Sequence, residues 1–275
     1  MLPDLKIAST SIPMYGLLAA LGCLLALVYL KRAEHRIPQL AADGELAMAY
    51  GAAGAFVGAK LFFLAVHLPA LVEALLGPGR DAGAILQRYL YSGFLFYGGL
   101  YGCLFAVWCY CRCSRVSFFE LLRLLLPVVP LVHALGRVGC FCAGCCYGRE
   151  TSAAWGLLFS RSEIAPRGIP LIPVQLLEAA VVFALFILLA LMSRRPDSGR
   201  RMLCSYLGIY GTARFFLEFL RGDIYRGFVG VLSVSQLLSL VAIALALLGR
   251  NAAVKRSAGR SHDRFLRQAS PPEEG

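Results

Sequence analysis

Long apolar runs dominate this chain and limit what it can fold into. Of its 275 residues, 59% are hydrophobic and 16% are charged, whereas soluble domains carry about 25% charged residues. A membrane-spanning helix needs roughly 20 mostly apolar residues, and backbone polar groups inside a bilayer must be satisfied internally. We therefore expect an all-α transmembrane bundle of about seven spans, near residues 13–30, 46–68, 92–111, 121–136, 171–192, 202–220 and 231–248.

The positions of Lys and Arg predict how the bundle is oriented. With the N-terminus outside, the inner segments hold 15 of these residues and the outer segments hold 9. Because cytoplasmic loops are enriched in Lys and Arg, we expect an external N-terminus and a cytoplasmic C-terminus. Residues 1–250 form one membrane domain in this interpretation, and 251–275 form a basic, disordered cytoplasmic tail.

The net charge of +11 also indicates what kind of partner the protein has. In a soluble protein such a charge suggests nucleic acid, but here the arginines lie between apolar runs. They are placed to meet anionic lipid headgroups. We expect the membrane itself, and no nucleic acid, to be the partner of this charge.

The sixth predicted span carries charged residues, which are costly in a membrane and are therefore candidates for a functional site. Arg214, Glu218 and Arg221 are spaced by four and three residues, which predicts one stripe on a helix. A self-contained ion pair is the alternative. We favour a site, because two arginines and one glutamate leave a surplus positive charge that suits a phosphate.

Two other spans carry buried polar residues. Gln175 and Glu178 are three residues apart and should share a face that points into the bundle. An interhelical hydrogen bond and a role in a site are equally good explanations for this pair. Lys60 either extends to the membrane interface or belongs to a site.

Small residues give the second and third predicted spans faces that are suited to close helix contacts. Gly98 and Gly102 form a G-x-x-x-G pair, and Gly54 and Gly58 give the second span a similar face. Packing is sufficient to explain these glycines. It does not explain Tyr97, which lies beside them and could line a pocket.

The segment 133–148 is rich in glycine and cysteine. Its glycines predict a non-helical backbone that starts near residue 136, with Arg137 where the fourth span ends. Cys142 and Cys145 form a C-x-x-C pair. For the thiols of Cys140, Cys142, Cys145 and Cys146 we favour tight packing over redox chemistry, and redox chemistry over a metal site, because no second well-spaced pair follows. We expect no cofactor.

Several motifs together resemble those of bacterial prolipoprotein diacylglyceryl transferases. The segment at 136–141 resembles the beginning of the family signature G-R-x-G-N-F-x-N-G-E-x-x-G. Other family motifs follow the expected order: W-Y-G-L, G-x-R-L, F-H-G-G-L, H-P-S-Q-L-Y-E and R-F-x-x-E-x-x-R. The segments of this chain that resemble them, in the same order, are Met14-Tyr15-Gly16-Leu17, Gly58-Ala59-Lys60-Leu61, Phe96-Tyr97-Gly98-Gly99-Leu100, Ile172-Pro173-Val174-Gln175-Leu176-Leu177-Glu178 and Arg214-Phe215-Phe216-Leu217-Glu218-Phe219-Leu220-Arg221.

The resemblance implies a multi-pass enzyme of the bacterial plasma membrane. Its substrates would be phosphatidylglycerol, or a similar anionic phospholipid, and the lipobox cysteine of a prolipoprotein signal peptide. The diacylglyceryl group moves to the thiol, and glycerol phosphate leaves. The resemblance implies that Arg137 and Arg214 hold the phosphate, with Glu218 positioning Arg214. It assigns the headgroup pocket to Tyr15, Gln175, Gly98, Gly99 and Arg221.

The chain also departs from the family pattern. Asn, Asn and Glu of the signature are replaced by Cys140, Ala143 and Cys145, and the His of H-P-x-Q is Ile172. The family's candidate base is Tyr97 here, and a tyrosine of pKa about 10 is a poor base. Two alternatives therefore stay open, namely a phospholipid-binding protein without transferase activity and a redox or metal protein that uses the cysteines.

Overall fold

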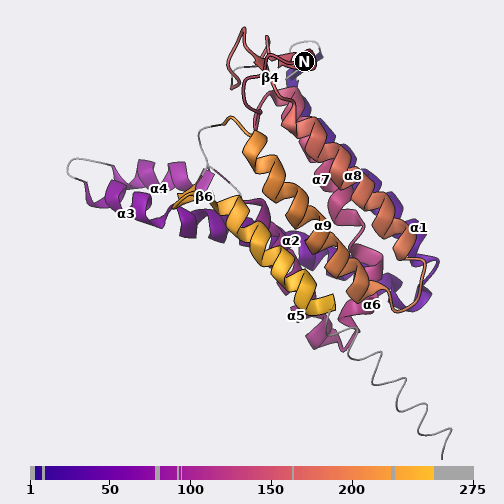
Figure 1. The fold of residues 1–275 in the computed structure, drawn as a ribbon. Helices are drawn as coiled ribbons and strands as arrows, with labels where there is room; N and C mark the ends of the chain where they lie inside the picture. Colours follow the sequence, from indigo (N-terminus) through magenta and orange to yellow (C-terminus); the bar gives the residue numbers. More distant parts are fainter. Residues whose placement is uncertain are drawn as a thin grey trace, which may run out of the picture.

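The computed structural model describes residues 4–7, 10–77, 81–91, 93, 95–162, 164–223 and 227–250. The predicted tail 251–275 lies outside these residues. The described chain is mostly helical (Figure 1). Its helices are α1 Met14–Glu34, η1 Pro38–Leu40, α2 Ala41–Val66, α3 Leu68–Leu76, α4 Ala82–Tyr91, α5 Phe96–Ser114, α6 Phe118–Leu125, α7 Val128–Ala143, α8 Val174–Met192, α9 Gly199–Leu220 and a last helix Val234–Arg250.

Short antiparallel strand pairs join some of these helices. The pairs in the described chain are β1 Asp4–Ile7 with β2 Thr10–Pro13, β3 Leu157–Leu158 with β4 Pro170–Leu171, and β5 Phe228–Val229 with β6 Leu232–Ser233. The sequence analysis expected helices alone, whereas the described fold also contains these short strands. The strands are two to four residues long and lie in the connections, which is why they left no periodic pattern in the sequence.

Four helical segments in the described chain are long and apolar enough to cross a membrane. They are Met14–Glu34, Pro38–Val66, Phe118–Ala143 and Val174–Met192. The other three predicted spans correspond to α5, α9 and Val234–Arg250. The helical membrane class is thus supported, while the count of seven spans stays a prediction. One predicted outer loop, 69–91, is largely helical and forms the arm of α3 and α4 on the left of Figure 1.

The glycines of the fourth span do not interrupt its helix, which corrects the prediction. Helix α7 continues through Gly136 and Gly139 to Ala143, so Arg137 lies inside the helix and not at its end. A glycine costs a helix only about 1 kcal/mol relative to alanine, which tertiary packing readily offsets. The helix ends at Gly144, whose φ of +76° is left-handed and whose N–H donates to the carbonyls of Cys140 and Phe141.

The contact between α2 and α5 uses the small residues that the sequence indicated. A Cβ atom on Gly58 would overlap the carbonyl oxygen of Gly98, and one on Gly102 would overlap that of Gly54. The two backbones therefore approach so closely that only glycine fits at these positions. This packing fixes the start of α5, where Tyr97 lies.

The buried core lies where α5, α7, α8 and α9 meet. Tyr206 and Tyr210 of α9 are fully buried and pack with Leu185 of α8 and Tyr97 of α5. In contrast, large apolar side chains on the outer faces, such as Phe105, are exposed. Such an inverted distribution suits a lipid solvent. A smaller cluster of Phe159, Ala165 and Leu171 packs beneath the strand pair β3–β4 at the top of Figure 1.

Candidate active site

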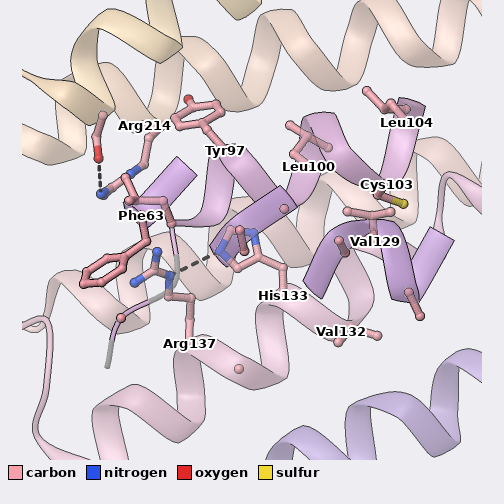
Figure 2. Close-up of a pocket in the computed structure, with 18 of the residues that line it drawn as sticks. Phe63, Tyr97, Leu100, Cys103, Leu104, Val129, Val132, His133, Arg137 and Arg214 are labelled. Carbon is pink, nitrogen blue, oxygen red and sulfur yellow. Dashed lines mark hydrogen bonds between the residues drawn. The ribbon is translucent and has the colours of Figure 1, made fainter. Parts of the chain in front are cut away.

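A cavity of about 1440 Å³ lies within the bundle. Its wall is aliphatic over one part and charged over another. Figure 2 places Leu100, Leu104 and Val129 on one side, and Arg137 and Arg214 on the other. The volume exceeds the usual range for drug-sized ligands. Such a cavity suits an amphiphilic molecule with an apolar body and an anionic head.

Glu178 of α8 is the centre of the charged part. Its side chain is 2% exposed, and its Oε1 lies 3.1 Å from Nη2 of Arg137 and accepts a 3.0 Å hydrogen bond from the Tyr210 hydroxyl. Its Oε2 lies 3.6 Å from Nη1 of Arg214. A buried carboxylate is costly unless it is paired. Near the start of α8, Glu178 is paired with one arginine from α7 and one from α9.

Arg137 is also oriented from within its own helix. His133 lies one turn earlier on α7, and Nε of Arg137 donates to its Nε2 over 3.2 Å (Figure 2). The same Nε2 also lies 3.5 Å from Oε1 of Glu178, so the imidazole contacts both the guanidinium and the carboxylate and helps to hold them together.

Arg214 forms the expected pair with Glu218. Its Nη2 lies 2.8 Å from Oε2 of Glu218, one turn later on α9, and donates to Ser235 Oγ over 3.3 Å. Its buried Nη1 has no hydrogen-bond acceptor among the described residues and faces Glu178 Oε2 at 3.6 Å. Arg214 is therefore held by two carboxylates, those of Glu178 and Glu218, while the residue itself lines the cavity.

The three charges of the predicted stripe, Arg214, Glu218 and Arg221, all line the cavity. Helix α9 ends at Leu220, and Arg221 has an extended backbone with φ of −75° and ψ of 140°. Its Nε and Nη2 donate to the carboxylate of Asp223 over 2.8 and 2.6 Å. Only the ψ of Arg221 leaves the helical range, so its side chain stays on the face that the spacing predicted while the chain turns away after it.

The other predicted site residues are placed around the cavity in different ways. Tyr97 lines it, and its hydroxyl forms a 2.5 Å hydrogen bond with Ser239 Oγ. Tyr15 lines it from the start of α1, and Gln175 Nε2 donates to the Cys145 carbonyl over 2.8 Å. Gly99 lines the cavity, whereas Gly98 faces Phe62 and Gly58 in the helix contact.

Three of the four clustered cysteines meet. The sulfur atoms of Cys140, Cys145 and Cys146 lie within 4.8 Å of one another, and all three residues line the cavity. Cys142 is outside this group, so the C-x-x-C pair that the sequence suggested is not the pair that the fold brings together. The reason is the helix itself, because Cys142 lies two residues from Cys140 and on a different face of α7.

Sequence reasoning undervalued two residues of this site. Glu178 was left undecided although it joins both arginines, and the signal for it was its shared face with Gln175. His133 is not among the predicted site residues, although its spacing of four from Arg137 predicts a contact. Lys60 belongs elsewhere, because its Nζ donates to the Tyr89 carbonyl over 2.8 Å at the arm of α3 and α4.

Comparison with known proteins identifies the same family independently of the structure. The family model for prolipoprotein diacylglyceryl transferase matches residues 4–250. A phosphatidylglycerol–prolipoprotein diacylglyceryl transferase of Clostridium tetani is 36% identical over 235 residues, covering 85% of this chain and 90% of the relative. That of Cupriavidus metallidurans is 32% identical over 240 residues, covering 84% and 85%. The chain therefore belongs to the prolipoprotein diacylglyceryl transferase family.

Proposed function

We propose that this protein transfers the diacylglyceryl group of phosphatidylglycerol to the lipobox cysteine in the signal peptide of a prolipoprotein. The observation that carries the proposal is the convergence of two arginines that line the cavity, Arg137 and Arg214 from different helices, on the buried carboxylate of Glu178. Two guanidinium groups fixed in this way are preorganised for an anion. The names of the relatives support the same substrates.

The reaction explains why the cavity needs both of its parts. The leaving group is glycerol phosphate, so positive charge must face the phosphate oxygen from which the glyceryl carbon separates. Arg137 and Arg214 supply it, while Glu178 and Glu218 position the two guanidinium groups. The acyl chains would extend along the aliphatic part of the wall.

The remaining predicted residues act around the headgroup in this proposal. Tyr15, Gln175 and Arg221 order the headgroup end, and Gly99 lets the lipid approach the α5 backbone. Gly98 contributes indirectly, by holding α5 against α2. Tyr97 supports the site through its hydrogen bond to Ser239 and does not serve as the base, since that bond already engages its hydroxyl.

We place the protein in the bacterial plasma membrane as a multi-pass protein of seven spans, with its N-terminus outside. The basic connections support this orientation, since Arg112 and Arg115 end α5, while Lys31 and Arg32 end α1. Both helix ends lie toward the bottom of Figure 1, whereas the start of the chain lies at the top beside β4. Positive charge at one end of the bundle is typical of the cytoplasmic side.

The test is transfer by the purified, full-length protein in detergent under reducing conditions. Labelled phosphatidylglycerol and a lipobox peptide should give a labelled thioether, and an Arg214→Gln variant should not. The matched control is Arg161→Gln, which removes an exposed arginine that does not line the cavity. Lack of labelled peptide with the wild-type protein would contradict the proposal.

A second function is favoured by one specific observation. The Asn, Glu and His positions of the family are Cys140, Cys145 and Tyr97 here, which suits a phospholipid-binding protein without transferase activity. Binding of phosphatidylglycerol without thioether formation would support that function. Rescue of a bacterial strain that lacks its own transferase would exclude it.

A further inference from the structure

The thiol cluster of Cys140, Cys145 and Cys146 has the spacing of a metal site. Its sulfur atoms lie within 4.8 Å of one another. Three sulfurs bound to one tetrahedral zinc ion, each at about 2.3 Å, are about 3.8 Å apart. The observed spacing therefore closes onto an ion with shifts of about an ångström or less, which side-chain rotation can supply.

The cluster is built by the end of α7. The left-handed Gly144 turns the chain back, so that the N–H of Cys145 donates to the Cys140 carbonyl over 3.1 Å. Cys146 follows with φ of 56°, a conformation that non-glycine residues rarely adopt and that is retained mainly at functional sites. Gln175 of α8 then fixes the Cys145 carbonyl at 2.8 Å.

The surroundings supply the charge that such a cluster needs. Gly148 pairs with Arg221 across an antiparallel bridge, which ties the cysteine loop to the end of α9. Arg137 and Arg221 both interact electrostatically with the Cys146 thiol. Three thiolates around a divalent cation carry a net negative charge, and the two guanidinium groups offset it.

We propose that Cys140, Cys145 and Cys146 bind a zinc ion through three thiolates, and that the fourth zinc position faces the cavity and takes the acceptor cysteine. Catalytic zinc sites typically have three protein ligands and an open position. The open position lies on the cavity side, because all three cysteines line that wall. The part concerning the acceptor rests on the proposed transferase function.

This zinc would supply the activation that Tyr97 cannot. The acceptor thiol binds as the fourth ligand and its proton leaves to water, because coordination to zinc deprotonates a thiol. The bound sulfur then attacks the glyceryl carbon that carries the phosphate ester. A C–S bond forms, the C–O bond breaks, and its electron pair leaves on glycerol phosphate beside Arg137 and Arg214.

The first experiment measures metal in the full-length protein, purified in detergent under reducing conditions without chelators. We expect about one zinc per chain. Cys140→Ser and Cys145→Ser should each lower zinc occupancy by about tenfold or more, because each removes one of three ligands. The matched control is Cys142→Ser, which lies in the same helix and outside the cluster, and it should keep its zinc.

The second experiment tests the open position by replacing zinc with cobalt(II), whose visible spectrum reports its ligands. A lipobox peptide should change the spectrum, and the same peptide with serine in place of cysteine should not. An unchanged spectrum would overturn the acceptor part of the proposal. A disulfide in the cluster, copper in place of zinc, or no bound metal in the wild-type protein would overturn the site itself.

Measurements of lipid transfer distinguish the zinc proposal from the proposed transferase function. If a zinc-free variant with all three cysteines changed to serine transferred lipid at the wild-type rate, the zinc proposal would fail and the transferase function would stand. Suppose that the wild-type protein bound zinc, and that its cobalt-substituted form responded to the peptide as expected. If the zinc form then made no thioether, the transferase function would fail and the metal site would stand.

Discussion

Arg137 on α7 and Arg214 on α9 face the two oxygens of a single buried carboxylate, at 3.1 and 3.6 Å. That carboxylate belongs to Glu178 at the start of α8. The three helices are therefore held together by charge at the wall of the cavity. Both guanidinium groups keep a fixed place there before any substrate binds, which is the condition for electrostatic catalysis.

Removing the charge of Glu178 should destabilise the protein as well as inactivate it. Glu178→Gln leaves two buried arginines with less compensation, and breaking a buried pair costs about 3–5 kcal/mol. We expect a lower free energy of unfolding in detergent and loss of transfer. Glu73→Gln, at an exposed position on α3, is the control. Equal free energies of unfolding for the two variants would show that the charge of Glu178 does not contribute to stability.

Replacing Arg214 by lysine should lower activity while the protein stays folded. Lysine keeps the charge but loses the planar fork that pairs with Glu218, Ser235 and a phosphate. Loss of one preorganised donor typically costs about 10²–10³ in rate, and we expect a similar fall in kcat. Arg161→Lys is the control. A fall in affinity for the lipid with unchanged kcat would argue against a role in the transition state.

Changing Tyr97 to phenylalanine should have a small effect. The hydroxyl is engaged by Ser239 at 2.5 Å, and general acid–base catalysis, worth about 10²–10⁴ in rate, would be lost only if this hydroxyl moved a proton. We expect less than a tenfold decrease and an unchanged pH profile of kcat/KM. A large decrease with a changed profile would identify Tyr97 as an acid–base group.

The contact between α2 and α5 gives a prediction about stability alone. In Gly58→Ala the new methyl group would meet backbone atoms of Gly98 and Gly102, and overpacking of this kind costs about 1–3 kcal/mol. Gly208→Ala is the matched control, because its Cβ would meet the Ala246 side chain at an ordinary 3.5 Å. Thermal unfolding should separate the two variants, and equal midpoints would contradict the close helix contact.

Gly144 provides a test of how the cysteine loop is built. Gly144→Ala strains a left-handed residue and would also place its methyl group on Ser162, whereas Gly168 has the same φ of +76° and open space around it. The strain alone is worth about 1–2 kcal/mol. We therefore expect Gly168→Ala to be mildly destabilised with its zinc retained, and Gly144→Ala to lose both stability and zinc. Retention of zinc in Gly144→Ala would separate the turn from the cluster.

The sequence by itself predicted the helices well, because each depends on a local pattern. Apolar runs of sufficient length located most of the long described helices within a few residues, although α7 extends to Ala143, and glycine spacing predicted a helix-contact face on both α2 and α5. The i, i+4 spacing also predicted the pair of Arg214 with Glu218, since both lie on one uninterrupted helix. The same spacing placed Arg221 with this pair, and all three residues line one cavity.

Only the tertiary structure decided which distant groups meet. Glu178 joins Arg137 to Arg214 because α7, α8 and α9 pack with their charged turns at the same depth, and no single-helix periodicity carries that information. Cys145 joins Cys140, and not Cys142, because a left-handed glycine reverses the chain directly after α7. Periodicity fixes which face of a helix a side chain occupies, whereas the packing of helices and the turns between them fix what that face touches.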